Sequence, residues 1–226
     1  SLKNLVNISM VLLGASPALP VMRKRYLPTI KDPAFHRVFI DGESRPIIFL
    51  FQASEQEAKM NGGWDAWRKQ WEAFRQESIA QGSGNPYFVA MCVGVGNYQQ
   101  AVTLKNNLGF DAISSYALPG GTIAGLPFSE LHSSALNFWN MAKDNNDVLV
   151  PNVPMGWDPR PRADHPPIWV NESAQHYNAP EPEELTNLIK SASSFIENNP
   201  SIVPSEAAIV YAWNENTEGG WLLPTK

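Results

Sequence analysis

The sequence has little cysteine, little charge and no long apolar run, and each shortage excludes a class of protein. Cys92 is the only cysteine among 226 residues, which excludes an internal disulfide and a cysteine-based metal site. No apolar run is long enough to cross a membrane as a helix. A net charge of −5 and a pI near 5.4 argue against nucleic acid or an anionic membrane surface as a partner. The single cysteine does not fix the compartment, although an extracellular or periplasmic one is favoured over the cytoplasm.

Several catalytic signatures are missing as well. The four histidines lack metal-ligand spacing such as HExxH, and we expect neither a metal nor another cofactor. No G-x-S-x-G serine elbow is present. The candidate nucleotide-binding turn Gly94-Val95-Gly96 has Gln99 where the third glycine belongs, and no P-loop lysine follows. These absences argue against a metalloprotease, a serine hydrolase and a nucleotide-binding enzyme.

The remaining composition is that of a globular protein with a sizeable core, because 43% of the residues are hydrophobic and 17% are charged. The length fits one large domain or two small ones, and we expect a single domain over residues 1–226. Eight tryptophans and nineteen prolines suit a loop-rich carbohydrate-binding surface, although some of the tryptophans must belong to the core.

Short apolar runs alternate with helical patterns along the chain. The expected strands are Leu5–Leu13, Pro46–Phe51, Tyr87–Val95, Asp111–Tyr116, Val148–Val153 and Ala207–Trp213. Helical spacing predicts a helix over Gly63–Gln81, a second from Asn97 to Gly109, a third capped by Ser129 and a fourth opened by Pro182. Alternating strands and helices predict a parallel sheet with outer helices, either doubly wound or a (β/α)8 barrel.

Long polar and aromatic loops follow many of the expected strands, which favours the barrel. These loops are Gln52–Gly63, Tyr116–Pro127, Asn152–Asn178 and Asn214–Pro224. A closed barrel has eight strands and the chain shows six, so we expect an α/β fold holding the C-terminal six βα units of a TIM barrel. We expect the N-terminal remainder of the barrel, or another chain, to cover the open edge.

Three local interpretations concern packing. Asp41-Gly42 predicts a tight hairpin before the second expected strand. The tryptophans at positions 64, 67 and 71 recur at helical spacing, which indicates packing of a helix onto the sheet instead of a sugar platform. Cys92 stands in an apolar run and is expected to be a buried strand residue.

The most informative stretch is the last expected strand and its loop, Ala207–Pro224. Glu215 and Glu218 follow the strand, with Trp213 before them and Trp221 behind. Two carboxyl groups in different environments can act as acid and base on a glycosidic bond, and sugar rings stack on tryptophan faces. The alternative is a solvated acidic turn.

Other candidate binding residues follow earlier strands. The proline-stiffened loop 151–162 carries Trp157 as a stacking platform and Arg160 as a donor to hydroxyls or to a carboxylate. The alternative is that Arg160 pairs with Asp158 and fixes the loop. Tyr116 ends a strand and faces either the barrel mouth or the core, and Asn152 is expected at the same end of the barrel.

The motif Trp213-Asn214-Glu215-x-x-Glu218-Gly219, with Leu222-Leu223-Pro224 behind it, resembles the closing motif of family 99 glycoside hydrolases and their WbsX-like relatives. Further stretches resemble the same WbsX-like group, so that the similarity extends from about residue 26 onward. They are Lys31-Asp32-Pro33-Ala34-Phe35, Ile40-Asp41-Gly42-(x)3-Arg45-Pro46 and Gly156-Trp157-Asp158-x-Arg160-Pro161-Arg162.

This resemblance implies a (β/α)8 barrel and a retaining, endo-acting mannose-active enzyme. It implies that Glu215 assists the sugar's own 2-hydroxyl as nucleophile, giving an anhydro-sugar intermediate, and that Glu218 is general acid and then base. Asn216 and Thr217 depart from the family pattern, which has an aromatic residue and a histidine there, and this departure bears on sugar specificity.

We therefore expect a glycoside hydrolase acting on a polysaccharide or glycan, with a mannan-like substrate. Its catalytic residues are Glu215 and Glu218, and its substrate-binding residues are Tyr116, Asn152, Trp157, Arg160, Trp213, Asn214 and Trp221. The alternatives are a glycosyltransferase-associated protein of polysaccharide assembly, as WbsX-like proteins imply, and a non-catalytic carbohydrate-binding barrel.

Overall fold

The computed structural model describes residues 7–13, 19–162, 166 and 174–222. The chain divides into two compact units, Ser1–Met91 with Gln99–Ile113, and Cys92–Tyr98 with Ser114–Lys226. The division falls inside two neighbouring strands, after Met91 and after Ile113.

The first unit is built on a parallel sheet. Strand β1 (Met10–Leu13) pairs in parallel with β3 (Glu43–Phe51), and β3 pairs in parallel with β4 (Tyr87–Cys92). Strand β5 (Ala112–Ser115) completes the order β1-β3-β4-β5. All six residues of β4 are buried, as expected of a central strand covered on both faces.

Strand β2 (Arg37–Ile40) adds an antiparallel hairpin to β3, with Ile40 opposite Glu43. Asp41 and Gly42 form the connection with φ of 53° and 82°, the left-handed pair of a type I′ turn. The hairpin expected at Asp41-Gly42 is confirmed.

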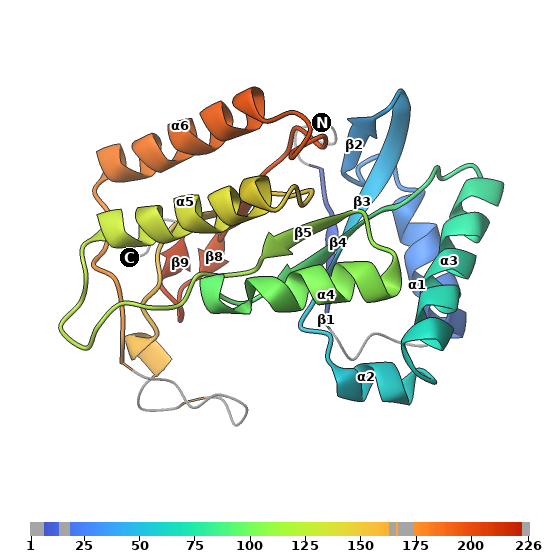
Figure 1. Cartoon of the computed structure of the whole chain (residues 1–226), viewed down its shortest axis with the longest axis horizontal. Coiled ribbons are helices and arrows are strands. Elements are labelled where there is room, and N and C mark those ends of the chain that lie inside the picture. The colour runs from blue at the N-terminus through green and yellow to red at the C-terminus, as the bar shows by residue number, and fades with distance from the viewer. Residues whose placement is uncertain (1–6, 14–18, 163–165, 167–173, 223–226) are drawn as a thin grey trace. The chain divides into compact units, whose positions relative to one another are not determined.

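Four helices accompany this sheet: α1 (Leu19–Ile30), α2 (Glu55–Met60), α3 (Trp64–Ala80) and α4 (Tyr98–Leu108). Helices α1 and α3 lie side by side (Figure 1). The sequence did not predict α1, because Pro20 and Pro28 interrupt its pattern. It did not predict α2 either, although Ser54 and Glu57 form a capping box at its start.

An aromatic cluster fills the core of the first unit. Trp71 on α3 meets Phe88 and Phe110 edge-on, with ring centroids 5.1 and 5.0 Å apart. Trp67 and Trp71 are fully buried among aliphatic residues of β3 and α1. The expectation that the tryptophans pack a helix onto the sheet is confirmed for Trp67 and Trp71, whereas Trp64 is only partly buried against the same core.

The second unit contains α5 (Phe128–Asp144) and α6 (Pro182–Asn198), which lie side by side in Figure 1. It also contains the parallel pair β6 (Asn152–Pro154) and β7 (Ile209–Tyr211) and the antiparallel pair β8 (Asn214–Glu215) and β9 (Gly220–Trp221). The short helix η1 (Val95–Asn97) precedes α4, and the short helix η2 (Arg160–Arg162) follows β6.

Two details of the helix predictions were wrong. Helix α5 begins at Phe128 with Pro127 as its N-cap, so Ser129 lies inside the first turn and is not the cap. On α6, the spacing of apolar residues predicts a buried stripe of Leu185, Leu188, Ile189, Ala192, Phe195 and Ile196. Leu188 and Ala192 are buried, but Ile189 is 52% exposed, because the helix rests on a narrower stripe than its apolar residues cover. Pro182 opens α6 as predicted, behind a capping box of Glu181 and Glu184.

A strand lies in or overlaps each of the six predicted apolar runs, although the beginning of the first run and the loop 152–178 lie partly outside the described residues. Pairing among the described residues gives the sheet β1-β3-β4-β5 with β2, the pair β6-β7 and the pair β8-β9. The fold is therefore α/β with parallel strands. Closure into a barrel, and its division into six units, stay predictions.

Candidate functional site

The carboxylate of Glu218 has a different donor on each of its two oxygens. The Arg162 guanidinium lies 2.7 Å from Oε1, and the two side chains are 14% and 15% exposed. The Tyr211 hydroxyl donates to Oε2. Tyr211 is the last residue of β7 and Arg162 ends η2, so the carboxyl end of one strand and the loop after another meet at this glutamate.

Tyr116, which follows β5, borders the same carboxylates. Its ring meets the Tyr211 ring edge-on, with centroids 4.9 Å apart and an interplanar angle of 64°. Burial raises the pKa of the Tyr116 phenol; the charges of Glu218 and Glu215 raise it further, and Arg162 opposes them. Tyr116 is therefore close enough to both glutamates of the predicted pair to interact with their charges.

Glu215 is half-buried on β8, and its Oε1 accepts a hydrogen bond from the Thr217 hydroxyl at 3.0 Å. Strand β8 opposes β9, with Asn214 paired to Trp221 and Glu215 paired to Gly220. The two glutamates therefore have different surroundings, since Glu218 contacts an arginine and a buried tyrosine whereas Glu215 contacts a threonine.

Main-chain contacts join the loops after β6 and β7. The Asp158 N–H donates to the Glu218 carbonyl at 2.7 Å. A Cβ on Gly156 would clash with the Gly219 carbonyl oxygen, and one on Gly219 would lie 2.5 Å from the Asp158 nitrogen. We call this arrangement the inter-loop contact. It requires glycine at both positions and sets the place of Glu218 relative to η2.

Arg160 and Arg162 have separate partners in this loop. Arg160 donates to both oxygens of Asp158, at 2.8 and 2.7 Å, and this pairing lowers the pKa of the Asp158 carboxyl. Its side chain is 53% exposed. This geometry agrees with the alternative that Arg160 pairs with Asp158 and fixes the loop. The arginine that contacts a glutamate is Arg162.

Asn152 is fully buried on β6. Its amide donates to the carbonyls of Ser115 and Tyr116, at 2.6 and 2.5 Å, and its main-chain carbonyl accepts from the Trp139 indole. Asn152 therefore holds the end of β5, which carries Tyr116, beside β6.

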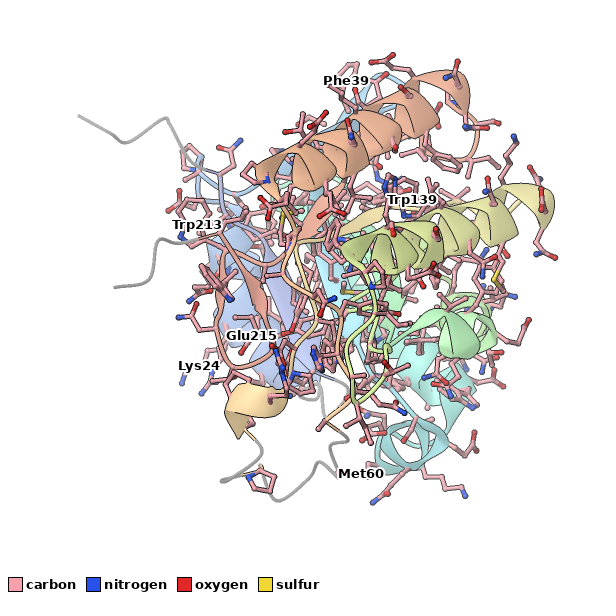
Figure 2. The ribbon with its side chains drawn as sticks, turned by 90° about the vertical axis from the view of Figure 1, so that its left-hand side faces the viewer. Lys24, Phe39, Met60, Trp139, Trp213 and Glu215 are labelled. Carbon is pink, nitrogen blue, oxygen red and sulfur yellow. The ribbon has the colours of Figure 1, made fainter. Side chains whose placement is uncertain are left out.

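The three tryptophans of the prediction lie in different settings. Trp157 is half-buried, and its carbonyl accepts from the Tyr177 N–H at 3.0 Å. Trp213 is 64% exposed and Trp221 is 40% exposed. Because the Leu222 N–H bonds the Trp213 carbonyl and side chains alternate along a strand, Trp213 shares a face with Glu215 while Trp221 lies on the opposite face. Figure 2 shows Trp213 and Glu215 at this hairpin.

Sequence reasoning missed Arg162 and Tyr211. Arg162 stands two residues from Arg160 in the quoted motif, and Tyr211 ends the apolar run before the glutamates. A polar aromatic residue at the end of a parallel strand, preceding a carboxylate, was the available signal for Tyr211.

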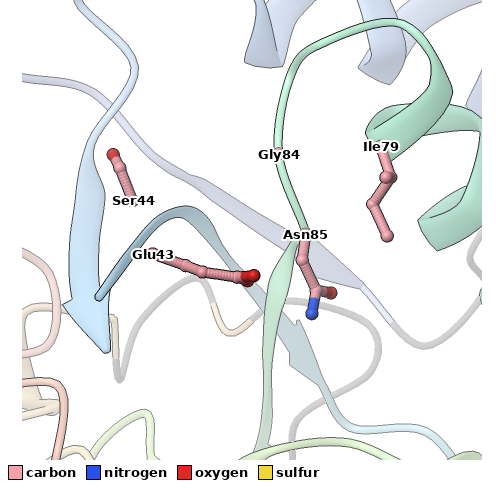
Figure 3. A pocket seen from close by; sticks show the side chains of 5 residues that line it. All are labelled: Glu43, Ser44, Ile79, Gly84 and Asn85. Carbon is pink, nitrogen blue, oxygen red and sulfur yellow. The ribbon is translucent and has the colours of Figure 1, made fainter. Parts of the chain in front are cut away.

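A shallow hollow of about 340 Å³ lies elsewhere, in the first unit. It is lined by Glu43, Ser44, Ile79, Gly84 and Asn85 (Figure 3). None of these residues was predicted to bind substrate. Across the described parts of the chain, no group of three or more His, Cys, Asp or Glu side chains is arranged for a metal ion, and no described helix has the length and apolar character needed to cross a membrane.

This α/β fold is similar to that of several solved structures. No known family model matches the chain, and no curated protein matches its sequence. A GH99 endo-α-mannosidase from Bacteroides thetaiotaomicron, in complex with bis-tris-propane, matches with a TM-score of 0.56 and 15% identity over 95% of this chain and 58% of that one. A second structure of the GH99 endo-α-mannosidase from that organism matches with a TM-score of 0.56 and 14% identity over 95% of this chain and 55% of the other.

These likenesses show that the chain has a GH99-like fold. The chain spans little more than half the length of the two enzymes.

Proposed function

We propose that the protein is a glycoside hydrolase that cleaves glycosidic bonds in a polysaccharide or glycan, with a mannan-like substrate. The observation that carries the proposal is that Glu218, in the loop after β7, is bonded by Arg162 and Tyr211, whereas Glu215 on β8 is bonded by Thr217. A carboxylate pair in two unlike environments is the requirement for acid/base work on a glycosidic bond. The GH99-like fold supports the same reaction class, and the sequence motifs support a WbsX-like relationship.

The proposed mechanism is retaining and uses the sugar's 2-hydroxyl. Glu215 accepts the 2-hydroxyl proton as O2 attacks C1, and Glu218 donates its proton to the leaving oxygen as the C1–O bond breaks. The product of this step is an anhydro sugar. Glu218 then takes a proton from water, whose oxygen attacks C1 and opens the anhydro ring, and Glu215 returns its proton to O2. After the two steps both glutamates have returned to their starting protonation states, and water is the only co-reactant.

The proposed binding residues divide by position. Tyr116 and Asn214 lie beside the glutamates in space or in sequence, and Trp157, Trp213 and Trp221 supply aromatic faces for stacking. Arg160 offers donors at the exposed edge of the loop. Asn152 serves the site from beneath, through its contacts with the main chain at Ser115 and Tyr116.

We also propose that the N-terminal remainder of a barrel, or another chain, covers the outer edge of β1. Val11 and Leu13 are 43% and 66% exposed along this strand. Within the described residues, β1 is paired only with β3, so its other edge is open to a further strand.

Replacing each glutamate by glutamine tests the proposal. A panel of polysaccharides, including α-mannans, identifies a substrate through released reducing ends. Glu218→Gln and Glu215→Gln are each expected to lower that activity by roughly 10²–10⁴-fold. A substrate whose leaving group needs no protonation should restore the first step for Glu218→Gln alone, because Glu215 is still required to activate O2.

Two results would contradict these assignments. Equal rescue of both variants would refute the division of roles. Binding of a glycan without cleavage, unchanged in Glu218→Gln, would indicate the non-catalytic carbohydrate-binding barrel.

A further inference from the structure

The environment of Glu218 is more constrained than its place in a short loop requires. One carboxylate oxygen contacts Arg162 at 2.7 Å and the other accepts from the Tyr211 hydroxyl. Two donors on two oxygens fix both the rotation of the carboxylate and the direction of its lone pairs. We propose that Arg162 and Tyr211 are positioning residues that orient the Glu218 carboxylate. This inference rests on the proposed function insofar as Glu218 is the acid and base of the reaction.

Tyr211 is held on every side that the structure describes around it. It is 3% exposed, and its carbonyl accepts from the Met155 N–H at 2.6 Å across the β6-β7 pair. Its ring meets Tyr116 edge-on, and a Cβ on Gly220 would lie 2.5 Å from its Cε1 atom. The Tyr211 ring is therefore closely packed, which fixes the position from which its hydroxyl oxygen bonds Glu218.

Arg162 is brought to the same carboxylate by its loop. The Arg162 N–H bonds the Pro159 carbonyl at 2.9 Å, which closes the η2 turn, and the inter-loop contact fixes the main chain of Glu218 against Asp158. The neighbouring guanidinium, that of Arg160, donates from Nε and Nη2 to Asp158, so it is directed at Asp158 and not at Glu218.

The consequence is electrostatic. A cation at contact distance from a carboxylate favours the charged form, and it does so strongly when both groups are mostly buried. Removing the Arg162 charge should make Glu218 easier to protonate, and removing the Tyr211 hydroxyl should act in the same direction by a smaller amount. The other titratable groups around this carboxylate and its loop are Tyr116, Asp158, Arg160, His176 and Glu215.

A direct titration tests the proposal without any substrate. In protein labelled with ¹³C at the glutamate carboxyl, the Glu218 signal is assigned by its loss in Glu218→Gln. We expect its titration midpoint to move upward in Arg162→Gln. A smaller upward movement is expected in Tyr211→Phe, and Arg162→Lys, which keeps the charge, should lie between wild type and Arg162→Gln.

Matched controls come from contacts of the same kind elsewhere. Tyr98→Phe removes a buried hydroxyl that bonds Asp147 at 2.6 Å, and Arg23→Gln breaks the ion pair with Glu77. Both should leave the Glu218 midpoint in place. A midpoint unchanged in Arg162→Gln and Tyr211→Phe, with amide spectra that show folded protein, would overturn the proposal and leave the two residues a purely structural role.

The same variants separate this proposal from the proposed function. If the protein hydrolyses a glycan, the alkaline limb of kcat/KM should move to higher pH in Arg162→Gln, because the general acid must be protonated. If no glycan is cleaved but the midpoint moves, the hydrolase proposal fails while the positioning of Glu218 by Arg162 and Tyr211 stands.

Discussion

The inter-loop contact predicts a large penalty for a single methyl group at Gly219. Its φ of 71° is left-handed, and an added Cβ would lie 2.5 Å from the Asp158 nitrogen and 2.7 Å from the Asp158 Cβ. A left-handed residue with a side chain costs about 1–2 kcal/mol, and forcing a group into a filled space costs about 1–3 kcal/mol. Gly219→Ala should therefore lower the free energy of unfolding by about 2–5 kcal/mol.

Three other glycines in the same unit separate the two contributions. Gly94 has a φ of 74° but only ordinary contacts, the nearest being Pro119 Cδ at 3.6 Å, so alanine there should cost about 1–2 kcal/mol through the backbone alone. Gly220 has no left-handed φ but presses on the Tyr211 ring, so alanine there should cost about 1–3 kcal/mol through crowding alone. Gly96 has neither feature, and Gly96→Ala should be neutral or stabilising by up to about 1 kcal/mol.

Urea denaturation of the four variants, followed by tryptophan fluorescence and far-UV circular dichroism, measures each cost. Gly219→Ala should cost more than either Gly94→Ala or Gly220→Ala. A Gly219→Ala protein as stable as Gly96→Ala would refute the close approach of the two loops. An added methyl group at Gly219 would push the main chain of the neighbouring Glu218 away from Asp158. Glycan cleavage should therefore fall in Gly219→Ala even where the protein remains folded.

Two further predictions concern buried groups away from the glutamates. Burial raises the pKa of the Cys92 thiol to about 12, so its thiolate fraction at pH 8 is ~10⁻⁴. Iodoacetamide should therefore react with it ~10³-fold more slowly than with an ordinary cysteine. A rate in the native protein within tenfold of the rate in the urea-unfolded chain would contradict this prediction. Asp111 accepts from Arg45, Arg75 and the Phe88 N–H, so Asp111→Ala should cost about 3–5 kcal/mol in urea denaturation by removing the carboxylate that both arginines share. The control Glu72→Ala breaks a 3.5 Å contact with the same Arg75, and the Glu72 side chain is 55% exposed. It should cost less than about 1 kcal/mol. Equal costs for Asp111→Ala and Glu72→Ala would refute the difference between the buried and the exposed ion pair.

Much of the fold follows from local sequence. The Asp41-Gly42 turn, the stripe of Trp67 and Trp71, and the helix opened by Pro182 each depend on residues close in sequence, and each prediction is confirmed. Helix α1 was missed because prolines at positions 20 and 28 made its apolar spacing unconvincing as a helix. In the structure, the packing of Met22, Leu27 and Ile30 against distant parts of the chain outweighs that local preference.

The candidate site depends more on distant contacts. Glu215, Glu218 and Tyr116 were proposed from residue types at strand ends. In the structure, the charges of both glutamates raise the pKa of the half-buried Tyr116 phenol. The choice between Arg160 and Arg162 was beyond the sequence, because it depends on which arginine Asp158 captures and on a main-chain bond between residues 158 and 218. Such a bond leaves no trace in side-chain identity except the glycines that permit it.

The inter-loop contact has a consequence for how the site can be changed. Its bonds involve main-chain atoms and glycines, so the side chains of Trp157, Asn216 and Thr217 take no part in it. Asn216 and Thr217 are exposed between the two glutamates, and Trp157 is half-buried on the facing loop. We therefore expect that these three positions can be exchanged while the main-chain contact beside Glu218 is kept, which makes them targets for redesigning the specificity of the proposed site.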